Sequence, residues 1–333
     1  MPEPWHELPL RLVTPAFLGH FDATDQNQAV VPFPVPSLRG VLAYWLRALA
    51  GAHVGNDTER LHDVEAAVFG AARTDTSGGQ SPIQLRACRV RLTVFDFRDE
   101  SDGVRYLMGP GLTASTDQPP RFLPPGSVSV RVRNLGSPPA ADLFLSALWA
   151  LRTFGGIGAR TRRGFGTLAL PGVPEITTGS FDLAWLRRDQ AGDLGAVIGC
   201  VGAAIGELRL AISLRPDKTA EDAPLYPCFA ANGYRCGSDD EDQLRGTATD
   251  WRSALDNTGT WLWGFRHGAS RRIPQSQPAR GAHSQSYDDV IKPYLDHPTG
   301  QRTQKGPFTA AALGLPIPYS DHQGPRDSKN KAG

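Results

Sequence analysis

The amino-acid sequence predicts an α+β fold, and two observations support that prediction. Between residues 8 and 170, segments with the two-residue alternation of strands are interspersed with segments that have the 3.6-residue period of helices. Their order is strand, helix, strand, strand, helix, strand, which is the order of a ferredoxin-like βαββαβ unit. The chain has 333 residues, enough for two domains with substantial cores.

The first strand and the first helix follow from hydrophobic spacing. Residues 8–14 alternate, with the leucines on one face. Apolar residues then recur at helical spacing over 38–50, and Ser37 is the predicted N-cap. The amino end of such a helix offers N–H groups to an anion. Arg39 and Arg47 lie eight residues apart on this helix, within roughly 80° of each other around its axis, so both could face one ligand strand.

Two further strands are predicted over residues 86–97 and 127–133, each alternating between an apolar and a polar or aromatic face. If they share a sheet, one face of it is basic and interleaved with Phe95 and Phe97. The arginines of that face are Arg89, Arg91, Arg131 and Arg133, with Arg11 beside them. Basic faces with interleaved aromatic rings hold single-stranded RNA. The alternative is an ordinary solvated face, or one covered by a second domain.

A glycine- and arginine-rich run, Gly155–Gly166, follows a predicted helix over 141–154 and precedes a short strand over 165–170. It holds five glycines, which permit positive φ and close backbone approach, and three arginines, whose planar donors suit phosphate oxygens. Exposed N–H groups in such turns make anion-binding concavities, so the run predicts a polyanion site, with RNA as the first candidate. The residues are Gly155, Gly156, Gly158, Gly164 and Gly166 with Arg160, Arg162 and Arg163.

The alternative for this run is a helix cap at Gly155 with solvated surface arginines. Two familiar nucleotide motifs do not fit. A P-loop needs four residues between its glycines and then Lys and Ser or Thr, whereas five residues separate Gly158 from Gly164 and Phe165 follows. A dinucleotide fingerprint follows a strand and opens a helix, which is the reverse of the order here.

The remaining segments set the expected organisation. Residues 73–82 and 99–125 are predicted as exposed, mobile loops, and 170–180 as a linker. Helices are expected over 181–188, 194–205 and 250–266, strands over 207–214 and 223–229, and a long polar, partly disordered segment over 268–305. The predicted domains are 1–172 and 173–319, followed by a disordered tail over 320–333.

Charge and cysteine usage exclude several classes of protein. The net charge is +1, so the chain has no global polybasic character. Its four cysteines form no CxxC pair, so we expect no metal site, no disulfide framework and no cofactor. The first ten residues lack a signal-peptide pattern, and no apolar run reaches the length of a membrane span. These features predict a cytoplasmic protein.

Four islands of sequence resemble one family. They are Thr14-Pro15 with Phe17-Leu18-Gly19, the helix Ser37–Ala48 with Trp45 and Arg47, the pair Phe69-Gly70, and the run Gly155–Gly166. In this order they are similar to the RAMP superfamily of CRISPR effector proteins, and within it to the first RAMP subunit of the type III-B Cmr complex. A late segment, residues 313–317, also resembles that subunit.

The resemblance implies tandem ferredoxin-like RAMP domains and a non-catalytic, RNA-binding role in an RNA-guided antiviral ribonucleoprotein. Its implied partners are guide RNA, target RNA and other RAMP subunits, with a position near the 3′ end of the guide. Carried over by motif, the implied RNA contacts are Ser37, Arg39, Arg47, Arg160, Arg162 and Arg163, with the five glycines shaping the loop. Family members usually continue after residues 313–317 into a further strand, which this sequence lacks, and His20 follows Gly19 where a small residue is expected.

Whether the chain is an enzyme depends on a few early residues. Related RAMP endonucleases that process guide RNA use a histidine in the first domain, and His20 has Asp22 and Asp25 nearby. RNA cleavage by acid–base catalysis needs a second proton carrier, and none is evident. The working hypothesis is therefore a non-catalytic subunit, with a guide-processing endoribonuclease as the alternative. The Ser37–Ala48 helix with Trp45 favours the first.

Overall fold

A computed structural model describes the chain over residues 4–18, 30–72, 79–87, 89–94, 100–109, 121–170, 194–212, 228–229 and 250–267. The chain divides into two compact units, Met1–Trp263 and Gly264–Gly333. The fold described below belongs to the first unit. Of the second unit, only residues 264–267, the last residues of a helix, lie in the described part.

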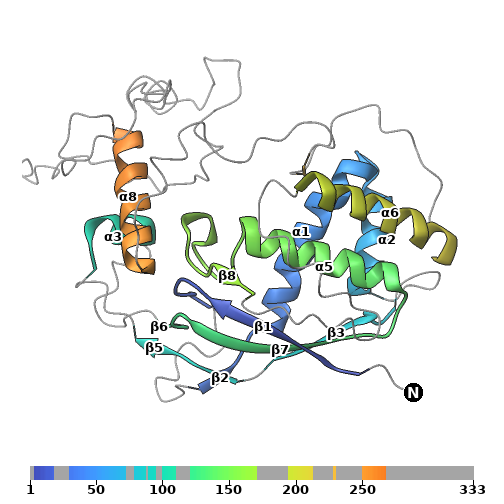
Figure 1. The fold of residues 1–333 in the computed structure, drawn as a ribbon, viewed down its shortest axis with the longest axis horizontal. Coiled ribbons are helices and arrows are strands. Elements are labelled where there is room, and N and C mark those ends of the chain that lie inside the picture. Colours follow the sequence, from blue (N-terminus) through green and yellow to red (C-terminus); the bar gives the residue numbers. More distant parts are fainter. Residues whose placement is uncertain are drawn as a thin grey trace, which may run out of the picture. The chain divides into compact units, whose positions relative to one another are not determined.

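A four-stranded antiparallel sheet forms the base of the first unit (Figure 1). Its strands are β1 (His6–Leu12), β3 (Ile83–Ala87), β7 (Gly126–Asn134) and β8 (Leu168–Ala169), in the order β3-β7-β1-β8. Counted within a βαββαβ unit this is the order 2-3-1-4, so the predicted ferredoxin-like arrangement is confirmed. The register places Leu8 opposite Val130 and Leu10 opposite Val128, so all four buried side chains share the core face.

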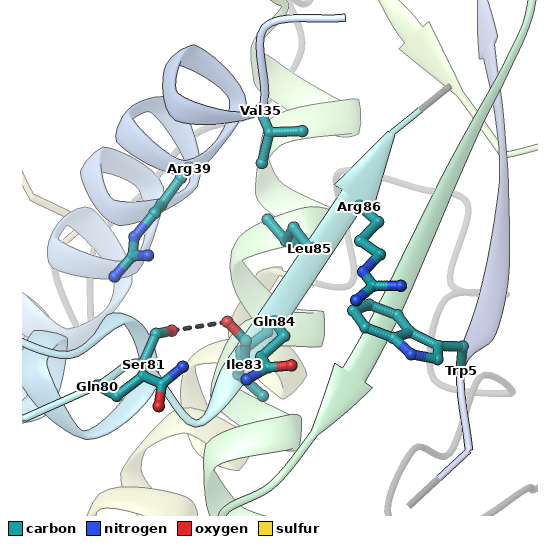
Figure 2. A pocket seen from close by; sticks show the side chains of 9 residues that line it. All are labelled: Trp5, Val35, Arg39, Gln80, Ser81, Ile83, Gln84, Leu85 and Arg86. Carbon is teal, nitrogen blue, oxygen red and sulfur yellow. Dashed lines mark hydrogen bonds between the residues drawn. The ribbon is translucent and has the colours of Figure 1, made fainter. Parts of the chain in front are cut away.

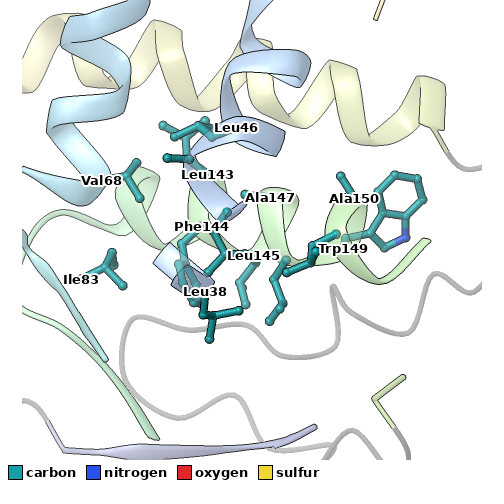
Figure 3. Packing of buried hydrophobic residues seen from close by; sticks show 14 of the residues in the cluster. Leu38, Leu46, Val68, Ile83, Leu143, Phe144, Leu145, Ala147, Trp149 and Ala150 are labelled. Atoms are coloured by element: carbon teal, nitrogen blue, oxygen red, sulfur yellow. The ribbon is translucent and has the colours of Figure 1, made fainter. Parts of the chain in front are cut away.

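Helices cover that core face (Figure 1). The helices α1 (Val35–Val54) and α5 (Pro138–Phe154) are the two crossover helices of the unit, and α2 (Thr58–Phe69) and α6 (Leu194–Ile212) pack on them. Figure 3 shows Leu38 and Leu46 of α1 meeting the buried stretch of α5 that includes Phe144, with Ile83 entering from the sheet. Removing this apolar surface from water is the main driving force for the fold.

One predicted helix cap and one predicted strand are wrong. Helix α1 begins at Val35, with Pro34 as its N-cap, so Ser37 lies inside the first turn and does not cap it. The early start is tolerated because Pro36 stands at the second helical position, where a missing N–H costs nothing. The strand predicted over 207–214 is also wrong, since α6 continues to Ile212; its buried residues repeat every three or four positions as far as Leu208.

The predicted strand over 86–97 is in fact three short strands in three sheets. Only β3 joins the four-stranded sheet. The strand β4 (Arg89–Arg91) pairs with β2 (Val30–Pro32), and β5 (Thr93–Val94) pairs with β6 (Arg121–Phe122). The alternation changes phase between β3, where the apolar residues Ile83 and Leu85 have odd numbers, and β4, where the buried Val90 has an even number. The first break therefore left a readable signal in the sequence, whereas the phase continues unchanged from β4 into β5.

The predicted mobile loop over 99–125 contains a helix, α3 (Asp102–Met108), with Val104, Leu107 and Met108 buried. In the predicted loop over 73–82, Ser81 is buried and donates to the carbonyls of Val68 and Ile83. The prediction of an exposed loop is therefore wrong for the α3 segment. Of the described residues 79–82, Gly79 and Gln80 are exposed as predicted, and Ser81 is not.

The predicted helix over 250–266 is confirmed as α8 (Trp251–His267). Asp250 precedes it and accepts a hydrogen bond from the Ser253 N–H at 2.9 Å, which lowers the pKa of that carboxyl. The helix packs on α3 through Leu255, which belongs to a second hydrophobic cluster with Phe17 and Phe165.

The contact between α3 and α8 is close. The N–H of Gly103 donates to Asp256 Oδ1 at 3.0 Å, and Arg252 forms an ion pair with Glu100 at 3.0 Å. A methyl group on Gly259 would collide with the backbone of Gly103, so both helices need glycine where they meet.

Several predictions lie wholly or largely outside the described residues. These are the linker over 170–180, the helix over 181–188, the polar segment over 268–305, the segment 313–317 and the tail over 320–333. Of the strand predicted over 223–229, only Cys228 and Phe229 are described, and neither is in a strand. The domain limits at 172 and 319 stay predictions.

We expect Gly259→Ala to lower the free energy of unfolding by about 1–3 kcal/mol, because the added methyl group overpacks the α3–α8 contact. The matched control is Gly40→Ala in the interior of α1, where a methyl group would meet nothing within 4 Å. That control should raise stability by about 0.5–1 kcal/mol through helix propensity. Denaturant unfolding of the two variants measures both, and an equal effect of the two substitutions would contradict the close contact.

Candidate nucleic-acid interface

The Gly155–Gly166 loop is attached to the chain segment that follows β1. The N–H of Gly166 donates to the Pro15 carbonyl at 2.8 Å, and the N–H of Ala159 donates to the Phe17 carbonyl at 2.8 Å. The rings of Phe17 and Phe165 meet edge to face, with centroids 5.2 Å apart. Two of the four motif islands are therefore one structural unit.

Thr14 holds this unit together from within. Its buried hydroxyl donates to the Gly164 carbonyl at 2.7 Å and accepts the Thr167 N–H at 2.9 Å. The Thr167 hydroxyl adds a bond to the same Gly164 carbonyl at 3.0 Å. One side chain thus satisfies backbone groups on both sides of the turn that leads into β8.

Glycine is required in the loop for two different reasons. Gly158 and Gly166 have φ of +90° and +69°, and a methyl group on Gly166 would overlap the Ile157 carbonyl. Gly155, the C-cap of α5, has an extended backbone instead; a methyl group there would lie 2.5 Å from the Trp45 indole nitrogen. Trp45, singled out in the α1 motif, therefore packs directly against the start of the loop.

Most of the loop's backbone donors are used internally. The loop N–H groups that donate to protein carbonyls are those of Gly155, Ile157, Ala159, Arg163, Gly164, Phe165 and Gly166. These groups are unavailable to an anion, so the predicted concavity of exposed N–H groups is wrong for them. The loop can still contact an anion through its arginine side chains.

The three loop arginines differ in their surroundings. Arg163 Nη1 donates to the carbonyls of Tyr106 and Leu107 at 3.3 and 3.1 Å, at the carboxyl end of α3, where a positive charge is favourable. The half-buried Arg160 also reaches the Gly109 side of α3 and is the one non-glycine residue with positive φ in the described part of the chain. Arg162 is exposed.

The α1 arginines lie on one face of the helix, as their spacing predicted, but that face meets α2. Arg47 Nη1 forms an ion pair with Glu65 Oε2 at 2.7 Å, and Arg39 lies over the Phe69 ring at 5.9 Å from its centroid. Sequence reasoning missed α2. Its cap was a readable signal, because Asp57 accepts the N–H of Arg60 three residues on.

The predicted basic sheet face has to be corrected. Arg89 and Arg91 lie on β4, in a different sheet from Arg131 and Arg133 on β7. The strand that pairs with β7 carries Arg86 directly opposite Arg131, and Glu7 of β1 lies on the other side of Arg131. Arg11 is exposed on β1, as expected, whereas Phe95 and Phe97 lie outside the described residues.

Sequence reasoning also missed Trp5. The guanidinium carbons of Arg86 and Arg133 lie 4.5 and 4.7 Å from its ring centroid. Trp5 also lines a cavity of about 380 Å³ beside β3, together with Arg39 and Arg86 (Figure 2). One arginine of α1 and one arginine of the sheet therefore line the same cavity, which the sequence pattern did not predict.

The weak catalytic candidates His20, Asp22 and Asp25 lie outside the described residues. Among the residues that are described, no three His, Cys, Asp or Glu side chains gather where they could hold a metal ion. Within the same ranges, no helix has the length and apolar character needed to cross a membrane.

Comparison with known proteins identifies relatives of the described unit. Residues 9–169 match the family model of the RAMP superfamily. The chain is 32% identical over 139 residues to CRISPR system Cmr subunit Cmr1-1 of Pyrococcus furiosus, covering 40% of this chain and 39% of that protein. It is 39% identical over 64 residues to Cmr1-2 of the same organism, covering 19% of this chain and 32% of the relative. The matches thus span two fifths or less of these relatives.

The fold is also similar to a solved structure. The crystal structure of Cmr1 from Pyrococcus furiosus in its apo form aligns with a TM-score of 0.52 at 19% identity, covering 79% of this chain and 72% of that one. At this identity the similarity concerns the fold, and it agrees with the ferredoxin-like arrangement of the sheet.

We expect Thr14→Val to destabilise the protein by about 1–3 kcal/mol, because it leaves the Thr167 N–H without its partner and removes a bond to Gly164. Thr14→Ser, which keeps the hydroxyl, should retain most of the stability. Thermal and denaturant unfolding of both variants provide the measurement. A valine variant as stable as the wild type would show that the hydroxyl does not hold the loop.

Proposed function

We propose that this chain is an RNA-binding subunit of a type III-B, Cmr-type CRISPR effector complex, because residues 9–169 match the family model of the RAMP superfamily. The observation that carries the proposal is the content of the matched region. It includes β3, β7, β8 and all of β1 after residue 8, together with helix α1 and the arginine-bearing Gly155–Gly166 loop. Both curated relatives are named as Cmr subunits.

The proposed partners are guide RNA, target RNA and other RAMP subunits, in the cytoplasm. The family resemblance implies a position near the 3′ end of the guide, where the subunit would help to capture target RNA. In this proposal it is non-catalytic. The alternative of a guide-processing endoribonuclease finds no support, because the matched relatives are named as subunits of the Cmr system.

The surroundings of the arginines divide their proposed roles. Arg162, which is exposed, and Arg160 beside it are the proposed phosphate contacts of the loop. Arg163 is engaged with the end of α3 and is proposed to brace the loop. Arg47 forms an ion pair with Glu65, so an RNA phosphate would have to share this arginine with the Glu65 carboxylate.

We expect the double variant Arg160→Ala/Arg162→Ala to bind single-stranded RNA more weakly and with a shallower salt dependence. Each phosphate contact to a single strand contributes roughly 0.7 to the slope of log affinity against log salt, so the slope should fall by about 1.4. Fluorescence anisotropy with a labelled oligonucleotide at several salt concentrations measures it. As a control, Arg163→Ala should lower the melting temperature and leave the slope nearly unchanged. An unchanged slope in the double variant would refute the phosphate role.

We expect the purified chain to leave a guide–target RNA duplex intact in the presence of Mg²⁺. Gel analysis of end-labelled strands provides the measurement, with the chain alone and at high concentration. Cleavage that His20→Ala or Asp25→Ala abolishes would contradict the non-catalytic assignment and restore the endoribonuclease alternative.

A further inference from the structure

Trp5 makes an unusual pair of contacts, with arginines from two neighbouring strands of the sheet. The guanidinium groups of Arg86 from β3 and Arg133 from β7 both lie against its ring. Arg133 is held in place by a hydrogen bond of 2.6 Å to Gln84 Oε1, and its buried Nε has no hydrogen-bond partner in the described part of the chain. The indole face is the group that Arg133 meets instead, a favourable cation–π arrangement.

The cavity beside Trp5 is an open hollow lined by basic and amide side chains. Its volume is about 380 Å³. Among the described residues, its lining includes two arginines, Arg39 and Arg86, and no Asp or Glu. Gln80 adds an amide group that can donate and accept hydrogen bonds, and Gln84, whose Oε1 accepts from Arg133, adds an amide NH₂ donor. Figure 2 shows these side chains arranged around one hollow, between the start of α1, the 80–81 loop, β3 and Trp5.

The charges around the cavity favour an anion. Arg86 and Arg131 lie directly opposite each other on neighbouring strands, where like charges are unfavourable. Glu7 lies beside Arg131 in the sheet, and Arg39 adds a second positive charge to the lining of the cavity. A phosphate group bound at Arg39 would offset a positive charge that no acidic residue of the described lining balances.

From these observations, and resting on the proposed function, we propose that this cavity binds one nucleotide of single-stranded RNA. The base stacks against the Trp5–Arg86 pair, a phosphate of the same strand meets Arg39, and the amide groups of Gln80 and Gln84 bond to the base edge. An aromatic ring paired with arginines is the usual means of holding an unpaired base. The site is separate from the Gly155–Gly166 loop.

The test compares full-length variants for binding to a labelled 15-nucleotide oligouridine by anisotropy. Base stacking on an aromatic ring corresponds to about a tenfold change in affinity, so Trp5→Ala should weaken binding by about that factor, while Trp5→Phe should retain most of it. The control is Tyr44→Ala, which removes an aromatic ring that is 44% exposed on α1 and outside the cavity lining. A Trp5→Ala affinity within twofold of wild type overturns the proposal.

A second probe separates stacking from charge. Inorganic polyphosphate carries phosphates but no bases, so Trp5→Ala should leave its competition unchanged, while Arg39→Ala should weaken the binding of both RNA and polyphosphate. Equal losses for RNA and polyphosphate on Trp5→Ala would overturn the stacking step. If Trp5→Ala leaves RNA binding unchanged but weakens binding of polyglutamate, the cavity holds an acidic peptide and the proposal fails.

Photocrosslinking tests the same site in the wild-type chain, so its result does not depend on whether a variant folds. Irradiation of the wild-type chain with oligouridine should place a crosslink on the peptide that contains Trp5, and its absence there would count against the site. The outcomes also separate the two proposals. If the wild-type chain binds no RNA, the proposed function itself fails; if binding depends on Arg160 and Arg162 but not on Trp5, only this inference fails.

Discussion

The hydroxyl of Thr14 is the contact on which the candidate interface depends. It joins the end of a central strand to the turn that leads into β8, and so connects the two hydrophobic clusters of the unit. On one side lie the sheet and its covering helices; on the other, Phe17 and Phe165 pack with α3 and α8. Because this hydroxyl is buried, its bonds are not exchanged for water and their loss would be costly.

The backbone and the side chains of the glycine-rich loop have different roles: the backbone holds the shape of the loop, and the side chains can contact a ligand. The glycines permit close packing against Trp45, Phe17 and the loop's own carbonyls, and most of the backbone donors are used in holding this shape. The arginines project from a backbone whose conformation is already determined. A polyanion would therefore meet a preorganised surface, which reduces the conformational entropy lost on binding.

Much of the fold could be predicted from the sequence wherever periodicity and burial coincide, as in β1, β7, α1, α5 and α8. Prediction failed where the pairing of distant strands determines which sheet a segment joins. The change of phase between Leu85 and Val90 marks the point where the chain leaves the main sheet, but the alternation itself does not show which strand each segment then pairs with. The arginines and glycines of the loop could be identified from the sequence. The partners of Arg163 could not, because they lie 56 and 57 residues earlier, in a helix whose composition predicts a loop. Trp5 gave no local signal, because its significance comes from two arginines on other strands.

The glycine contact between α3 and α8 has a consequence for how the chain is synthesised and folded. Gly103 meets a segment that leaves the ribosome some 150 residues later, as the 153-residue separation of the Gly103–Asp256 bond shows. The ferredoxin-like sheet and its helices can assemble first, because their residues precede α8 in the chain. Until α8 has been synthesised, Leu255 cannot pack on the apolar side of α3. Such long-range closure is slow, so this side of the first unit is the part of the nascent protein in which a chaperone would find exposed apolar surface.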